Sequence, residues 1–379
     1  MKKNLKYDIL TGKIFPSPSK NRVYDYSHSP QNKLGKLYDP SIDQLWVERE
    51  GVTPKWPNNK PYAVCITHDV DVISLQSNKE NIRRIKHILK TWKQQKSKQN
   101  SILVFESLEN IMNGIFSKQD PYHRFEDWLN VEQEVGARST FFFAPEYVLK
   151  PHFTDCWYKY DDILKFEGEK ISVAELMREI NRRGWEIGLH PSWNSYNSVD
   201  ELKHQKDQVE KVIENEIVSI RQHFLHFDNK ITPAVQSAAG FKYDATLGFN
   251  DNIGFRRGTS YVYPLIDLVS NDRLPIWEIP LIIQDGAMFH PKKGMRLDKE
   301  TALEYIQLLK EKVRNVGGIL TLLWHTHLIV DEIRWDTFQE GLKMLQKDDP
   351  WFASVREIGD WWSNNVKIDL VSFIENSEE

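Results

Sequence analysis

The sequence has few cysteines and no long apolar run. Only Cys65 and Cys156 occur among 379 residues, so a disulfide framework is excluded and a reducing compartment is expected. No stretch approaches the ~18 consecutive apolar residues of a membrane-spanning helix. The N-terminal segment is basic but lacks the apolar core of a secretory signal, and we therefore expect a cytoplasmic protein.

The chain also lacks a strong charge of either sign. Lys and Arg number 50 against 54 Asp and Glu, a net charge of -4, which disfavours a nucleic-acid partner. Aromatic residues, in contrast, make up 12% of the chain and include 13 Trp. These rings can serve a core or a binding surface. The length fits one large or two ordinary domains.

Short apolar segments alternate with helical patterns through the middle of the chain. Ser172, followed three residues later by Glu175, is a capping-box candidate at the start of one helix. Because strands that alternate with helices form mostly parallel sheets, we predict an α/β fold of the (β/α) barrel type. The expected strands lie at 62–67, 139–145, 185–190, 220–227, 243–249, 274–281 and 318–327, and the expected helices at 123–136, 172–184, 199–215 and 301–315.

The flanking segments have weaker patterns. We expect an irregular N-terminal extension at 1–59 packed on a barrel at 60–365, followed by a C-terminal tail at 366–379. Residues 78–118 predict a helical insertion that begins strongly basic. A solvated helical face is its simpler interpretation, and a docking surface for an anionic substrate or lipid is the alternative.

Polar residues gather where the expected strands end. Asp69 and Asp71 follow the first strand, and His190, Arg221 and His325 follow later ones. In barrels of this type, functional side chains gather at the C-terminal ends of the strands. Imidazole and carboxylate groups are ligands of zinc, and a catalytic site leaves one position for water. The pattern therefore indicates a metal site with nearby acid and base groups.

Six segments together resemble the polysaccharide deacetylase family, also called the NodB-homology domain or carbohydrate esterase family 4. They are THDVD, STFFF, MREINRRGWEIGLHPS, YDATLGF, WEIP and LLWHTH, and they span roughly residues 60–330. The resemblance implies a distorted (β/α) barrel and a metal-dependent hydrolase. Most members remove N-acetyl groups from amino sugars.

The family's roles transfer to individual residues of this sequence. Asp69 resembles the catalytic base, and Arg221 the arginine that pairs with it. Asp71 and His190 resemble metal ligands, and His325 resembles the general acid. The resemblance implies a divalent cation, with Zn²⁺ as the first choice.

Three positions depart from the family pattern. Asn194 stands where a second metal-binding His is usual, and His223 stands where the family has proline. His223 or a water as the replacement ligand, a loosely held metal and a lost metal are all open alternatives. His68 replaces a Phe, and we expect it to orient Asp69 or His325 through a hydrogen bond.

Residues beside these motifs are expected to contact the substrate. We assign this role to Trp193, Trp324, His68, His327 and Glu278, with a buried partner for an arginine as the alternative for Glu278. The expected substrate is an amino sugar or a sugar-containing precursor of a surface polysaccharide. Other Trp residues, such as Trp46, Trp56, Trp361 and Trp362, are expected to pack the terminal segments.

Two other functions compete with deacetylation. Hydrolysis of another C–N bond, in a cyclic imide, a ureide or a formamide, is the first. A non-catalytic carbohydrate-binding protein on a degenerate barrel is the second. Asn194 favours the second, whereas four retained residues disfavour it, because a binding module needs neither a base nor an acid: Asp69, Asp71, Arg221 and His325.

Overall fold

A computed structural model describes residues 5–15, 26–75, 81–83, 85, 86, 89 and 120–377. Most of the basic insertion expected at 78–118 lies outside the described residues, as do parts of the flanking segments. In the described part of the chain, no helix is long and apolar enough to cross a membrane.

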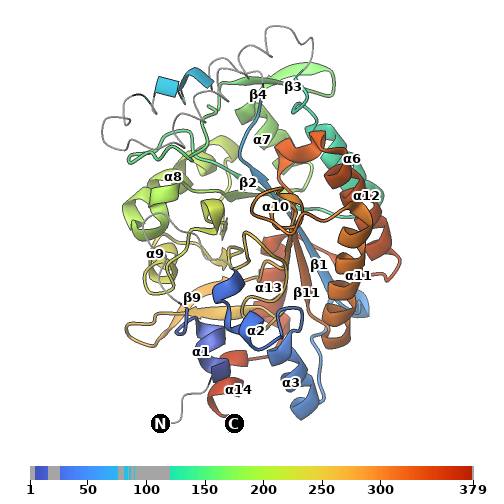
Figure 1. Ribbon diagram of the computed structural model, residues 1–379. Coiled ribbons are helices and arrows are strands. Elements are labelled where there is room, and N and C mark those ends of the chain that lie inside the picture. The colour runs from blue at the N-terminus through green and yellow to red at the C-terminus, as the bar shows by residue number, and fades with distance from the viewer. Residues whose placement is uncertain are drawn as a thin grey trace.

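The centre of the molecule is one curled, largely parallel sheet (Figure 1). Its strands follow the order β10-β11-β1-β2-β5-β6-β7-β9-β8, and β12 also pairs with β1. Only β8 runs antiparallel, against β9. The sheet is thus an open half-barrel, as expected for a distorted (β/α) barrel. The strands are β1 (Ala63–Val70), β2 (Thr140–Phe143), β5 (Glu186–Leu189), β6 (Ser219–Ile220), β7 (Tyr243–Asp244), β8 (Tyr263–Ile266), β9 (Arg273–Glu278), β10 (Ile283–Gln284), β11 (Ile319–Leu323) and β12 (Trp351–Phe352).

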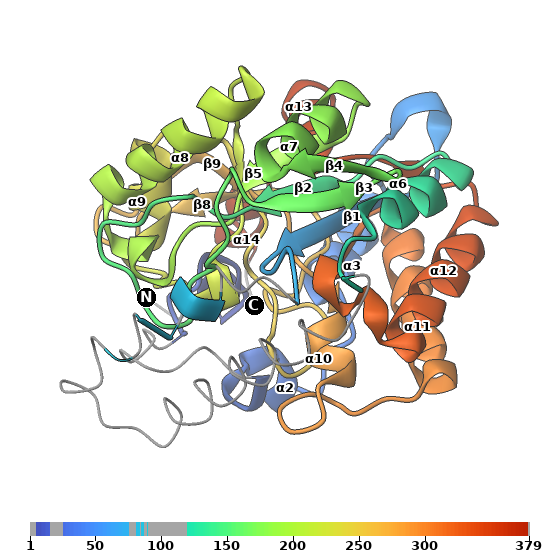
Figure 2. The same cartoon turned by 90° about the horizontal axis from the view of Figure 1, so that it is seen from above.

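Helices surround the outer side of this sheet (Figure 2). The expected capping box is confirmed at the start of α7: the Ser172 hydroxyl accepts from the Glu175 backbone N–H, and the Glu175 carboxylate accepts from the Ser172 N–H. A separate hairpin, β3 (Ile163–Phe166) with β4 (Glu169–Ser172), precedes this helix. The helices of the barrel are α6 (Phe125–Glu134), α7 (Val173–Arg182), α8 (Val199–Ile213), α9 (Thr232–Ala238), α10 (Asp285–Phe289), α11 (Lys299–Val316), α12 (Glu332–Gln346) and α13 (Val355–Asn365).

The N-terminal segment is more regular than its sequence suggested. It contains α1 (Leu5–Thr11), α2 (Pro30–Lys33) and α3 (Ser41–Glu50), which corrects the expectation of an irregular extension. These helices are too short to show a clear period. Tertiary contacts hold them, because α1 and α3 pack against α14 (Leu370–Glu375) near the C-terminus (Figure 1).

Two of the flanking Trp residues form the packed junction between the ends of the chain and the barrel. Trp56 is 2% exposed and donates its indole N–H to the Gly317 carbonyl at 2.8 Å. Its ring lies 5.9 Å from that of Trp362 on α13, which is 1% exposed. Both therefore serve packing, as the sequence indicated.

Candidate metal centre and catalytic site

The polar strand ends meet at one edge of the sheet. Asp69 lies near the end of β1 and Asp71 just beyond it, His190 follows β5, Arg221 follows β6, and His325 is the second residue beyond β11. Because these strands are parallel neighbours, their C-terminal ends share one edge. A cavity of about 320 Å³ opens there. It is lined by Asp69, Asp71, His190, His223, Phe224, Leu225, Asn250, Gln284, Gly286, His290, Lys293, Leu323, His325, His327, Leu328 and Arg334.

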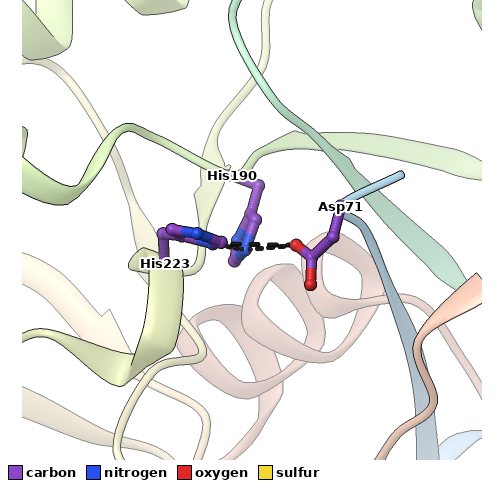
Figure 3. A group of neighbouring side chains, drawn as sticks. All are labelled: Asp71, His190 and His223. Atoms are coloured by element: carbon purple, nitrogen blue, oxygen red, sulfur yellow. Dashed lines mark hydrogen bonds and ion pairs between the residues drawn. The ribbon is translucent and has the colours of Figure 1, made fainter. Parts of the chain in front are cut away.

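Three of these residues form a group that could hold a metal ion. They are Asp71, His190 and His223, and each offers one ligand atom within 4.8 Å of the others (Figure 3). His190 Nε2 lies 3.2 Å from Asp71 Oδ1 and 2.8 Å from His223 Nδ1. His223 comes from the single-turn helix η4 (His223–Leu225), directly after β6 and Arg221. His223 therefore lies beside His190, where it could serve as the third ligand that the sequence left unassigned.

Backbone carbonyls orient the two imidazoles of this group. His190 Nδ1 donates to the Arg221 carbonyl at 2.8 Å, and His223 Nε2 donates to the Thr154 carbonyl at 2.7 Å. A carbonyl oxygen only accepts, so the proton of each neutral ring is fixed on that nitrogen. The two remaining nitrogens, with their lone pairs, then face each other and the Asp71 carboxylate. Such an arrangement requires a proton or a cation between the acceptors, and it suits a divalent metal.

The charges of this group favour one proton on His190 when no metal is bound. Burial would lower the pKa of His190, but the carboxylates of Asp69 and Asp71 raise it above its usual value. Burial and the neighbouring His190 charge lower the pKa of His223 to about 4. Despite burial, hydrogen bonding to His190 and the charges of nearby histidines hold the pKa of Asp71 well below its usual range. A divalent cation would take the place of the His190 proton.

Asp69 lies beside this group and is held by a buried arginine. Arg221 Nη1 donates to Asp69 Oδ1 at 3.3 Å and to the Thr67 hydroxyl at 2.6 Å. Arg221 Nε donates to the Ala245 carbonyl at 2.8 Å, so the guanidinium has a fixed direction. The other oxygen of Asp69 lies 3.7 Å from His190 Nε2. A carboxylate next to the metal group is thus placed to accept a proton.

His325 faces the group from the opposite side and has a carboxylate behind it. Its Nδ1 donates to Asp285 Oδ1 at 2.6 Å, and its backbone N–H donates to the other Asp285 oxygen at 3.1 Å. Its Nε2 lies 3.8 Å from Asp71 Oδ2. Burial would lower the pKa of His325, but the charge and hydrogen bond of Asp285 raise it to about 9. The ring is therefore protonated at neutral pH and can donate a proton.

Asp285 is a site residue that the sequence analysis missed. It follows β10, a strand of two residues, and Gln284 of β10 pairs with Leu323 of β11. This pairing places Asp285 beside the end of β11, where His325 lies. A weak signal exists in the sequence, because Asp285 lies two residues beyond the apolar run at 281–283, just as Asp69 lies two residues beyond the expected strand at 62–67.

Two expected substrate contacts must be corrected, because the side chains lie in the core. His68 is 0% exposed and packs 4.7 Å from the ring of Trp128 on α6. Its Nδ1 bonds the Trp324 carbonyl at 2.9 Å and its Nε2 bonds Glu132 at 2.6 Å, so it orients neither Asp69 nor His325 directly. Trp324 is 1% exposed and packs on Phe338 of α12. Neighbours in a strand alternate between its two faces, and these residues face the helices.

Glu278 and Trp193 are also buried. Glu278 is 0% exposed, and its carboxyl accepts from the Leu247 backbone N–H at 2.8 Å. Burial and the neighbouring Asp244 carboxylate raise the pKa of Glu278 well above its usual value. Trp193 is 8% exposed, and its ring stacks between those of His152 and His226. Neither residue lines the cavity. The expectation that Glu278 and Trp193 contact the substrate is therefore corrected: they are buried side chains that support the site.

His327, expected to contact the substrate, and Asn194, expected near the metal, lie in different surroundings. His327 lines the cavity, with its ring 5.9 Å from that of His325, and its contact with substrate stays a prediction. Asn194 donates its amide to the Lys150 carbonyl at 2.8 Å and is not among the cavity-lining residues. The described structure therefore gives Asn194 a hydrogen-bonding partner outside the group of Asp71, His190 and His223.

Comparison with known proteins identifies the fold. No family model matches the sequence, and no curated protein matches it. Among solved structures, the chain is similar to the putative polysaccharide deacetylase of Mycobacterium smegmatis, with 20% identity, a TM-score of 0.53, and coverage of 82% of this chain and 92% of that one. It is also similar to the probable polysaccharide deacetylase of Pseudomonas aeruginosa PAO1, with 14% identity, a TM-score of 0.52, and coverage of 84% and 96%.

A third solved structure of similar fold is named for a different reaction. Puue allantoinase matches with 11% identity, a TM-score of 0.51, and coverage of 84% of this chain and 95% of that one. At these identities the matches show the fold and no more. The chain thus has the distorted barrel of the polysaccharide deacetylases, with an Asp/His/His group that could hold a metal.

Proposed function

We propose that this protein is a metal-dependent hydrolase that removes an N-acetyl or similar acyl group from an amino sugar. One observation carries the proposal: two imidazoles, each fixed by a backbone carbonyl, converge with Asp71 beside a separate acid and base. Asp71, His190 and His223 would hold the metal. Zinc is the proposed ion, because imidazole and carboxylate groups suit it.

The proposed reaction divides the roles among the side chains of the cavity. When bound, a divalent cation supplies Lewis acidity for the acyl carbonyl and the attacking water. Asp69, held in place by Arg221, accepts the proton of the water. His325, kept protonated by Asp285, donates a proton to the departing amine. Each of the two carboxylates has its own cationic partner, Arg221 for Asp69 and His325 for Asp285. This division agrees with separate roles as base and acid.

The cavity and the comparisons support a small amide as the substrate. A volume of about 320 Å³ lies at the lower end of the range for small-molecule sites, roughly 300–1,000 Å³. Two of the similar structures are named polysaccharide deacetylases. We propose an acylated amino sugar from the cytoplasmic precursors of a surface polysaccharide. Hydrolysis of a ureide is the second candidate, supported by the fold similarity to an allantoinase.

The test compares Asp69→Asn with a matched control, Asp336→Asn, which changes an exposed carboxylate on α12. Zinc-loaded enzyme is assayed for acetate release from N-acetylglucosamine and its derivatives and, in parallel, for opening of allantoin. We expect Asp69→Asn to reduce turnover about 10²–10⁴-fold, since a general base contributes that much, and Asp336→Asn to have no effect. Turnover by Asp69→Asn equal to that of the wild type would refute the assignment of the base. Activity on allantoin alone would replace the first candidate by the second.

A further inference from the structure

The cavity has one wall that is held in an unfavourable backbone conformation. Phe224 and Leu225, directly after His223, both have positive φ, at 55° and 54°. Bulky residues rarely adopt this left-handed region, and they persist there only where the surrounding structure imposes it. Here the Asn250 amide donates to the Phe224 carbonyl at 2.9 Å and so helps to hold the turn. Strain of this kind is characteristic of functional sites.

The turn leaves the Phe224 ring at the mouth of the cavity. Phe224 is 45% exposed although it lines the cavity. Its ring meets Trp193 edge-on, with centroids 5.7 Å apart, and lies 4.6 Å from the ring of His223. These contacts fix the ring while one part of it stays accessible. A fixed, half-exposed aromatic ring is suited to a flat apolar surface such as the C–H face of a sugar.

A second wall is a basic loop anchored on α10, the helix that begins with Asp285. His290 Nδ1 accepts the backbone N–H groups of Lys292 and Lys293, at 3.1 Å and 3.2 Å. The Gly294 N–H then donates to the His290 carbonyl at 3.0 Å. A Cβ at Gly294 would lie 2.5 Å from the Ala287 carbonyl, so glycine permits this close approach. The loop therefore has a defined path that brings Lys293 to the cavity.

Lys293 is the cation of the cavity that is left without a carboxylate in the described part of the chain. Both Lys293 and Arg334 line the cavity. Arg334 Nε lies 3.1 Å from Asp331, and its guanidinium lies 3.8 Å from Asp285. The acids of the cavity are engaged as well, Asp69 with Arg221 and Asp71 with the metal group. Lys293 is itself exposed, so its ammonium can meet an anionic group that a ligand brings into the cavity.

We propose that the substrate is a small acylated sugar bearing an anionic group, with its ring face on Phe224 and its anion at Lys293. This inference rests on the proposed function, because the acyl group must reach the metal group at the base of the same cavity. The anion can be a phosphate or a carboxylate, since a lysine ammonium binds either as a point charge. A charge-assisted contact of this kind predicts about a tenfold preference for the anionic ligand.

Binding of three probes to the zinc-loaded full chain tests this inference. The probes are N-acetylglucosamine 6-phosphate, N-acetylmuramic acid with its carboxylate, and neutral N-acetylglucosamine, each measured by isothermal titration calorimetry. The variant is Lys293→Gln, and the matched control is Lys292→Gln, an adjacent exposed lysine that does not line the cavity. The wild type and Lys292→Gln should bind at least one anionic probe about tenfold more tightly than the neutral sugar. Lys293→Gln should lose this preference.

A second variant separates the aromatic wall from the charge. Phe224→Gly removes the ring and suits the positive φ at this position, so the variant is expected to fold. It should weaken neutral and anionic probes by the same factor, about 2- to 12-fold if stacking is worth an ordinary aromatic contact. Unchanged binding of all three probes by Phe224→Gly would overturn the role of the ring.

The outcomes keep this inference apart from the proposed function. Equal affinity of the wild type for all probes, or an equal preference in Lys293→Gln and Lys292→Gln, overturns the anion subsite even if deacetylation is observed. Anion-selective binding without any acetate release supports the subsite and refutes the proposed hydrolysis. Preference for the phosphate over the carboxylate probe, or the reverse, identifies the source of the charge.

Discussion

Two groups of histidine and carboxylate lie on opposite faces of β1 and its continuation. They differ in whether any ring nitrogen keeps a lone pair that faces the cavity. On the helix side, His68 bonds the Trp324 carbonyl and Glu132, and Glu132 in turn accepts the indole N–H of Trp185 at 2.6 Å. On the cavity side, His190 and His223 each donate a hydrogen bond from one ring nitrogen to a backbone carbonyl, and the other ring nitrogen faces Asp71. In the first group both ring nitrogens of His68 are hydrogen-bonded to oxygen atoms, whereas in the second group two ring nitrogens face each other and Asp71.

This difference shows that residue type alone does not identify a metal site. Both groups combine imidazole with carboxylate, and the imidazoles of both are buried. Only the cavity-side group keeps lone pairs that converge on one point, and only this group borders open space. The hydrogen bonds on the far side of each ring therefore decide between a structural and a functional histidine.

The largest expected effect is the loss of metal binding when the cavity-side group is broken. His190→Ala removes the lone pair that faces both Asp71 and His223, and we expect zinc content to fall from about one per chain to near zero. His204→Ala, on the outer helix α8, is the control and should retain zinc. Elemental analysis after gel filtration measures both. Full zinc content in His190→Ala would show that the metal, if any, binds elsewhere.

The helix-side group should govern stability instead. Glu132→Gln removes the carboxylate that His68 and Trp185 share and leaves two donors facing one amide. Breaking a buried pair of this kind costs about 3–5 kcal/mol, so the thermal midpoint should fall by several degrees. The zinc content of the folded fraction should remain about one. A variant with unchanged Tm and lost zinc would reverse the roles of the two groups.

A smaller effect is expected at Asp285, which acts through His325. Asp285 raises the pKa of His325 to about 9, and the proton donor must be protonated to act. Asp285→Asn lowers that pKa, so the alkaline fall of kcat should begin at lower pH. The rate at neutral pH should decrease about 10–100-fold, a range known for residues that support a metal site. An unshifted alkaline limb in the pH–rate profile would exclude His325 as the proton donor.

The smallest effect is expected at Asn194. Its amide donates to the Lys150 carbonyl, so Asn194→Ala should leave zinc affinity within about threefold of the wild type. His223→Ala, in contrast, should lose zinc as His190→Ala does. Competition with a chromogenic chelator measures both constants. A zinc affinity that depends on Asn194 and not on His223 would assign the third ligand to position 194.

The sequence located β1, β2, β5, β6, β7, β9 and β11, but not β8, β10 or β12, and it named six of the residues that line the cavity. What it located depends on local order. Apolar runs that end in Asp or His located β1, β5 and β11, and parallel neighbours bring such ends together. The sequence also named His223, although it left open whether this residue replaces Asn194. The capping box at Ser172 was predicted for the same reason, because its four residues act within one helical turn.

The errors came from contacts between distant segments. β1 is buried on both faces, so its apolar pattern does not show which face borders the cavity. Alternation along the strand separates His68 from Asp69 and could have corrected the first assignment, as it could for Trp324 and His325. Asp285 was missed because the strand before it has two residues, and only its pairing with β11 places it beside His325. The terminal helices depend in the same way on contacts between the two ends of the chain.

Anomalous diffraction at the zinc edge, from crystals of the zinc-loaded chain, tests the central claim most directly. We predict one peak bonded to Asp71, to Nε2 of His190 and to Nδ1 of His223, with metal–nitrogen distances of about 2.0–2.1 Å. The helix-side group of His68 and Glu132 should show no peak. Absence of a peak at Asp71 with stoichiometric zinc present, or a peak whose ligands exclude His223, would contradict the account.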